Sequence, residues 1–151
     1  MDKSAPKAIH LKDYAPPPYL IDSVDLAFDL GEEVTRVKSS LTMRANPSRN
    51  PEQAAALVLD GQDLKLVALA IDGRALDASE YAVGVESLTI FDPPSSFTLE
   101  VETELKPQEN TSLEGLYRTS GNFCTQCEAE GFRKITYFLD RPDVMARYRT
   151  T

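Results

Sequence analysis

The strongest structural signal in the chain is the stretch FTLEVETEL, residues 97–105, in which apolar and polar side chains alternate. A period of two residues indicates a β-strand with one buried face and one exposed face. The exposed face carries three glutamates in a row. These repel one another, and we expect them to form a solvated face that discourages edge-to-edge aggregation. The predicted buried residues are Phe97, Leu99, Val101 and Leu105.

The same alternation occurs twice nearer the amino terminus. Residues 23–30 place four apolar side chains on one face, and residues 36–44 alternate in the same way after the turn Gly31-Glu32-Glu33. The two segments are therefore predicted to form a hairpin. The outer face of the first is acidic and that of the second is basic, which favours their pairing by roughly a few tenths of a kcal/mol per pair.

Other segments also read as strands. Residues 64–71 are apolar on both faces, which predicts a central strand, and the following Asp72-Gly73 predicts a tight hairpin turn. No convincing 3.6-residue period occurs before residue 113, and residues 131–139 read as a helical turn or irregular structure. The sequence predicts a mainly β protein, an antiparallel β-sandwich or a saddle-like bent sheet, with little helix, confined to the C-terminal part. Further strands are expected at residues 55–59, 81–83, 88–91, 123–127 and 144–151.

The chain has 151 residues, a length that predicts one β-rich domain, with residues 1–12 as a poorly ordered lead-in. The extended pattern simply stops at Thr151, so we expect a chain cut before a further domain. A net charge of -8 argues against nucleic acid as a partner. No apolar run suggests a membrane span and no secretory signal is present, so a soluble cytoplasmic protein is expected.

The two cysteines, Cys124 and Cys127, form a C-x-x-C motif, which is found in zinc sites and in redox pairs. A structural zinc needs about four ligands, and the only histidine, His10, lies far away in the sequence. A thioredoxin-like pair opens a helix in a βαβ unit, whereas this pair follows a predicted strand. We therefore expect two reduced, partly buried thiols, with metal binding or redox chemistry as the alternative.

Gln126 and Glu128 alternate with these cysteines. At positions i and i+2 of an extended segment they point the same way, and together they offer a neutral amide and a carboxylate to one ligand. Such a pair suits an ammonium group, because the carboxylate balances its charge and both side chains accept its N–H donors. An ordinary exposed loop carboxylate is the alternative that spacing alone leaves open.

The chain contains no G-x-S-x-G, no glycine-rich phosphate loop and no H-E-x-x-H motif. It therefore holds no complete catalytic apparatus of these kinds. A non-catalytic β-sandwich interaction module that uses its glutamate face is the alternative function.

The run CTQCEAEGFRKITYFLDRPDV, residues 124–144, closely resembles a segment near the end of the amino-terminal domain in the bacterial aminopeptidase N family of zinc-dependent H-E-x-x-H peptidases. The resemblance extends upstream through residues 113–117, 97–99, 57–61 and 13–14, and so covers nearly the whole chain.

This resemblance implies a β-rich amino-terminal domain that packs on a thermolysin-like catalytic domain of the same polypeptide and lends it a substrate-anchoring loop. Gln126 and Glu128 match the Gln-x-Glu of that loop, which lies at the S1 pocket, where the glutamate binds the free α-amine of a peptide, alanyl and others. The zinc ligands, the Gly-x-Met-Glu-Asn motif and the general-base glutamate belong to the catalytic domain. No metal or catalytic residue is therefore expected in this chain, and by itself it is expected to be inactive.

Overall fold

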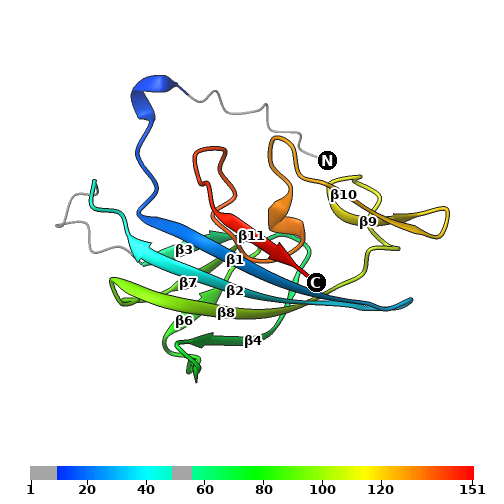
Figure 1. Cartoon of the computed structure of the whole chain (residues 1–151), viewed down its shortest axis with the longest axis horizontal. Helices are drawn as coiled ribbons and strands as arrows, with labels where there is room; N and C mark the ends of the chain where they lie inside the picture. Colours follow the sequence, from blue (N-terminus) through cyan, green and yellow to red (C-terminus); the bar gives the residue numbers. More distant parts are fainter. Residues whose placement is uncertain (1–9, 49–55) are drawn as a thin grey trace.

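The computed structural model describes residues 10–48 and 56–151. Within these ranges no α-helix occurs, and the mainly β prediction is confirmed (Figure 1). Of two 3-10 turns, η2 (Phe132–Lys134) lies in the C-terminal part, as predicted, but η1 (Leu11–Asp13) precedes the first strand. The strands are β1 (Tyr19–Leu30), β2 (Thr35–Ala45), β3 (Leu57–Asp60), β4 (Lys65–Ile71), β5 (Arg74–Ala75), β6 (Tyr81–Val83), β7 (Ser87–Ile90), β8 (Ser96–Leu105), β9 (Gly115–Thr119), β10 (Asn122–Gln126) and β11 (Arg147–Thr150).

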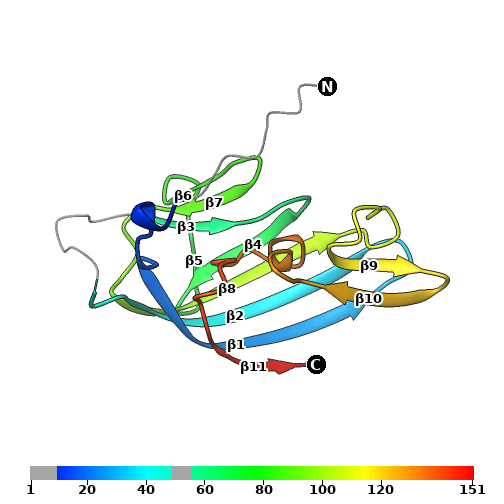
Figure 2. The same ribbon diagram turned by 90° about the horizontal axis from the view of Figure 1, so that it is seen from above.

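The strands form three sheets. The largest has the order β11-β1-β2-β8-β4-β5, the second has the order β3-β7-β6, and β9 and β10 form a separate hairpin. All pairs are antiparallel as predicted, except that β11 runs parallel to β1. Figure 2 shows the three-stranded sheet stacked over one end of the curved large sheet, with the hairpin at the other end.

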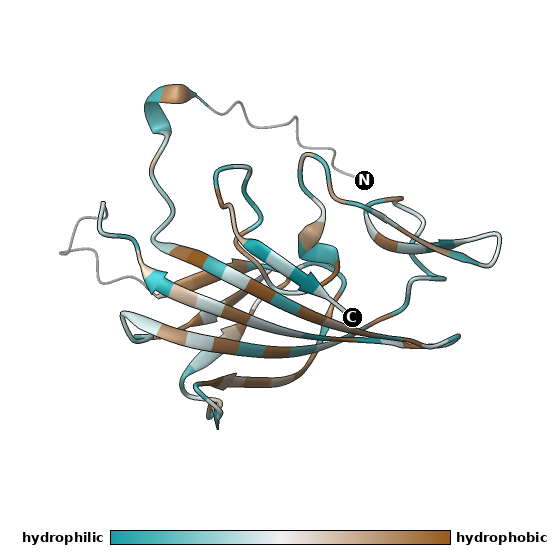
Figure 3. Ribbon diagram, in the orientation of Figure 1, coloured by the Kyte–Doolittle hydropathy of each residue, from teal (hydrophilic) through white to brown (hydrophobic). Residues whose placement is uncertain are grey.

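The hydrophobic core lies between the large sheet and the three-stranded sheet. The alternation read from the sequence is visible along the long strands in Figure 3, and its predicted apolar face on β8 is buried as expected. A fully buried leucine contributes roughly 1.5–3 kcal/mol relative to an exposed one. The three-stranded sheet supplies Leu57, Leu59, Leu88 and Ile90, each at most 1% exposed.

The glutamates of β8 do not guard an edge, because β8 lies between β2 and β4. Glu104 accepts hydrogen bonds from Lys65 Nζ at 2.7 Å and from Arg36 Nη2 at 2.8 Å. Glu102 lies 3.7 Å from Lys38 Nζ. The hydrogen bond from Lys65 is the main reason that the pKa of Glu104 lies below its ordinary value. Basic residues of β2 and β4 thus offset the repulsion between Glu102 and Glu104 that the sequence predicts.

The predicted central strand β4 does lie between two strands, β8 and β5, but β5 has two residues and pairs only with Ala70 and Ile71, so most of β4 has a neighbour on one side alone. A register shift between Leu66 and Ala68 interrupts its pairing with β8, and Val67 at this irregularity is 42% exposed. The predicted turn after β4 is confirmed, with positive φ at both Asp72 and Gly73. The two-sided apolar pattern therefore reflects a bulge near an edge of the sheet.

A segment running from η2 to Asp140 is bound to both sheets. The hydroxyl groups of Ser39 on β2 and Thr136 are 3.0 Å apart, and the Thr103 hydroxyl on β8 donates to the carbonyl of Ile135 at 3.3 Å. On the other side, Phe138 exchanges two backbone hydrogen bonds with Asp60 of β3. We call residues 131–140 the buried segment, since most of its residues are buried.

In residues 10–48 and 56–151, neither 3-10 turn has the length and apolar composition needed to cross a membrane.

Replacing a core leucine by alanine tests the packing of the two sheets. Leu59 is 0% exposed, whereas its neighbour Val58, on the other face of β3, is 50% exposed. Leu59→Ala is expected to lower the free energy of unfolding by about 2–5 kcal/mol in urea titrations, through lost burial and a cavity. Val58→Ala is expected to cost less than about 1 kcal/mol. Equal losses would contradict the assigned packing.

Candidate functional site

The predicted site lies where the β9–β10 hairpin leads into the buried segment. Gln126 is the last residue of β10 and pairs with Gly115, the first residue of β9. Glu128 lies in the bend that follows the strand, and the peptide bond after it is cis. Both side chains are exposed. We call residues 127–131 the acidic loop, since it carries Glu128 and Glu130.

Two glycines allow the acidic loop to close against the hairpin. A Cβ atom at Gly131, where φ is +152°, would lie 2.9 Å from the carbonyl oxygen of Gln126 and 3.2 Å from Cα of Cys127. At Gly115, where φ is +71°, it would lie 2.5 Å from Cβ of Lys134 and 3.0 Å from the carbonyl oxygen of Gly131. A side chain at either position would therefore displace backbone at the base of the loop.

The carboxylate of Asp140 fixes the end of the acidic loop. Its Oδ2 atom accepts hydrogen bonds from the backbone N–H of Gly131 at 3.0 Å, the backbone N–H of Arg133 at 3.2 Å and Nε of Arg133 at 2.8 Å. The Asp140 side chain is 8% exposed. No local sequence pattern marks Asp140, since its partners lie seven and nine residues away.

The two glutamates of the acidic loop differ in their partners. Glu130 lies 2.8 Å from Nη2 of Arg133, which also binds Asp140. Burial lowers the pKa of Arg133, but the hydrogen bond to Asp140 and the nearby carboxylates outweigh it and hold that pKa above its ordinary value. Among the described residues, Glu128 has no hydrogen-bond or ion-pair partner. It is thus the carboxylate left available to a ligand.

The two cysteines are free and half-buried. Burial, and to a smaller extent the carboxylate of Asp140, raises the pKa of the Cys127 thiol. A raised pKa lowers the thiolate fraction, and the thiolate is both the nucleophile and the metal ligand. In the part of the chain that the structure describes, no group of three His, Cys, Asp or Glu side chains is placed to hold a metal ion. A zinc site does not fit these residues.

An aromatic cluster begins at Phe132, the residue that follows the acidic loop. The ring of Phe132 lies 4.7 Å from that of Phe138 and 6.0 Å from that of Tyr148, measured between centroids. Burial raises the pKa of Tyr148, and the charges of Asp140 and Cys127 add to this. The sequence predicts the extended segment that carries Tyr148 but not its contact with residues near 132 and 138.

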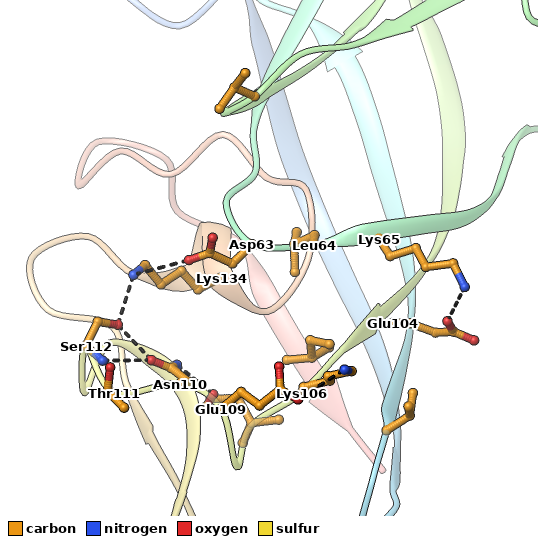
Figure 4. Close-up of a pocket in the computed structure, with 14 residues that line it drawn as sticks. Asp63, Leu64, Lys65, Glu104, Lys106, Glu109, Asn110, Thr111, Ser112 and Lys134 are labelled. Carbon is orange, nitrogen blue, oxygen red and sulfur yellow. Dashed lines mark hydrogen bonds and ion pairs between the residues drawn. The ribbon is translucent and has the colours of Figure 1, made fainter.

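An open pocket of about 830 Å³ is lined by Lys134 of η2, shown in Figure 4. Lys134, whose side chain is 9% exposed, donates to the Ser112 hydroxyl at 2.9 Å and lies 3.9 Å from Asp63. Lys65 and Lys106, which also line the pocket, are paired with Glu104 and Glu109. The lysines and glutamates of this pocket are thus already paired, and neither Gln126 nor Glu128 lines it.

These features define a β-sandwich domain that presents one unpaired carboxylate on a tightly anchored loop. Residues 17–151 match the Peptidase M1 N-terminal domain, and the chain belongs to this family. It is 51% identical over 148 residues to the aminopeptidase N of Caulobacter vibrioides, which covers 98% of this chain and 17% of that protein. It is 44% identical over 145 residues to the aminopeptidase N of Escherichia coli, covering 96% of this chain and 16% of that protein.

Solved structures of related peptidases contain a domain with the same fold as this chain. The aminopeptidase A of Legionella pneumophila, crystallised in complex with aspartic acid, superposes with a TM-score of 0.85 at 37% identity and covers 93% of this chain and 16% of its own. An M1 zinc metallopeptidase from Deinococcus radiodurans has a TM-score of 0.69 at 17% identity, covering 89% of this chain and 32% of its own. The second likeness shows a shared fold. The chain thus corresponds to a small part of the relatives that it matches.

Thiol reactivity tests the environment of Cys127. In a Cys124→Ser variant only Cys127 remains, and its raised pKa and partial burial predict slow alkylation by iodoacetamide at pH 8. The rate in the folded chain is expected to be at least about 10-fold below that of the same chain in denaturant. Equal rates would show that the thiol is neither shielded nor shifted.

Proposed function

We propose that this chain is the amino-terminal domain of a zinc aminopeptidase that removes N-terminal residues from peptides, and that Glu128 and Gln126 anchor the free α-amine of the substrate. Membership of the Peptidase M1 N-terminal domain family supports the first part. The second part is carried by one observation, the exposed carboxylate of Glu128 without a partner among the described residues, next to a Glu130 held by Arg133.

The chemistry of the pair suits this role. An α-ammonium group has three N–H donors and a positive charge. A carboxylate balances the charge, and the amide oxygen of Gln126 accepts a further hydrogen bond. An exopeptidase must hold this amine at a fixed distance from the scissile bond, so that only the first peptide bond reaches the reacting centre. Glu128 would set that distance.

The residues described here form no zinc site. The resemblance implies that the metal and the hydrolytic groups belong to a catalytic domain of the same polypeptide, on which this domain packs. The part proposed for this chain is to bind and orient the substrate.

An interaction module that uses the glutamate face of β8 is less well supported. Glu102 and Glu104 are 20% and 16% exposed and are paired with basic side chains of β2 and β4. Glu100, the third glutamate of that face, is exposed and has no ion pair among the described residues, so one free carboxylate remains there for a basic partner.

Kinetics of the full-length aminopeptidase test the role of Glu128. Charge-assisted hydrogen bonds contribute about 1.5–3 kcal/mol, so Glu128→Gln is expected to lower kcat/KM for an alanyl anilide by roughly 10- to 150-fold. Glu109→Gln is the control, an exposed glutamate outside the acidic loop that pairs with Lys106 at 3.0 Å, and it is expected to change kcat/KM by less than about 2-fold, because such an exposed ion pair contributes little. Unchanged kinetics for Glu128→Gln would refute the assignment.

The isolated chain is a second test. We expect the purified 151 residues to bind no stoichiometric zinc by elemental analysis and to cleave no aminoacyl anilide, since the catalytic motifs are absent from the sequence. Measurable turnover by the chain alone would contradict the proposed division of roles.

A further inference from the structure

We infer that Asp140 is a positioning residue for the amine site, through the hydrogen bonds by which it fixes the acidic loop and occupies Arg133. The inference rests on the proposed function of Glu128. Asp140 has no place in the sequence motif that singled out Gln126 and Glu128, and it lies twelve residues beyond Glu128 in the chain.

The first argument is geometric. One oxygen, Oδ2 of Asp140, accepts three hydrogen bonds of 2.8 to 3.2 Å from Gly131 and Arg133, which follow Glu128 by three and five residues. The guanidinium of Arg133 also donates to the carbonyl oxygen of Asp140 at 3.2 Å. The end of the acidic loop is therefore tied to one carboxylate and cannot shift without breaking several bonds at once.

Asp140 is itself attached to the core. Its backbone N–H donates to Oδ2 of Asp60 at 3.1 Å, and Asp60 pairs with Phe138 on the same buried segment. Asp60 ends β3, whose residues Leu57 and Leu59 are fully buried. A continuous series of contacts thus runs from the core through Asp140 to the acidic loop.

The second argument is electrostatic. Arg133 is the nearest cation in sequence to Glu128, and a guanidinium free to reach that carboxylate would compete with a substrate ammonium group. Arg133 instead binds both Asp140 and Glu130, each at 2.8 Å. The Asp140 side chain is 8% exposed, so little solvent weakens this pair. Two carboxylates thus hold the arginine and leave the third for the ligand.

A double-mutant cycle in the full-length aminopeptidase tests this inference. Asp140→Asn removes the charge at nearly constant size. It is expected to lower kcat/KM for an alanyl anilide by about 10-fold, mainly through KM, because the amine contact is misplaced. In a Glu128→Gln background the same change is expected to cost less than about 2-fold, since two residues acting through one contact are not additive.

Asp143→Asn is the matched control. Asp143 lies three residues after Asp140 but pairs with Arg141 and Tyr14 instead of the acidic loop, and its replacement is expected to leave kcat/KM unchanged. Melting temperature and zinc content are measured for every variant. If Asp140→Asn does not fold, Arg133→Gln replaces it as a test of the loop anchor alone, because Arg133 is more exposed and its loss breaks the same contact while it also removes the competing cation.

The outcomes separate the two proposals. If Glu128→Gln lowers kcat/KM but Asp140→Asn or Arg133→Gln has no effect, or the same fold effect in both backgrounds, the positioning role is refuted and the amine site stands. If Glu128→Gln itself has no effect, the amine site and the positioning role fall together. Non-additive losses in a folded, zinc-loaded enzyme support both.

Discussion

The structure depends on the hydrogen bonds that attach the buried segment to both sheets. A chain passing through the interior must satisfy its backbone groups, since an unpaired buried carbonyl or N–H group costs about 1–3 kcal/mol. Here the hydroxyl groups of Ser39 and Thr103, on the large sheet, form hydrogen bonds with the segment. Asp60, on the three-stranded sheet, pairs with it through its backbone. The buried Ser39 of β2 and Thr103 of β8 are thus explained by the segment that they contact.

This arrangement connects the core to the acidic loop. The same segment that packs between the sheets ends at Asp140, and Asp140 holds Gly131 and Arg133. The acidic loop lies at the surface, but these hydrogen bonds hold its end in place against the core. The two glutamates of the loop differ in their contacts. Glu130 is bound by Arg133, whereas Glu128 is exposed and has no partner among the described residues.

Local patterns predicted much of the fold, because alternation and turn residues act over a few positions. β1, β2, β8 and the Asp72-Gly73 turn follow directly from them. The inner position of β8 and the parallel direction of β11 were missed, since pairing between distant strands leaves no local signal. Gln126 and Glu128 could be named from spacing and resemblance. Asp140 could not, since its role arises only when distant backbone groups converge on it.

The pairing of β11 with β1 has a consequence for the order of folding. Ser23 aligns with Arg147 and Leu26 with Thr150, so this pair joins residues more than a hundred positions apart. Tyr148 of β11 then contacts Phe132 and Phe138 next to the acidic loop. The β1–β2 hairpin can form early from local contacts, whereas long-range pairing is slow. During synthesis, the contacts of Tyr148 with Phe132 and Phe138 must wait until residues 147–150 have left the ribosome, so this cluster next to the acidic loop is among the last parts of the domain to form.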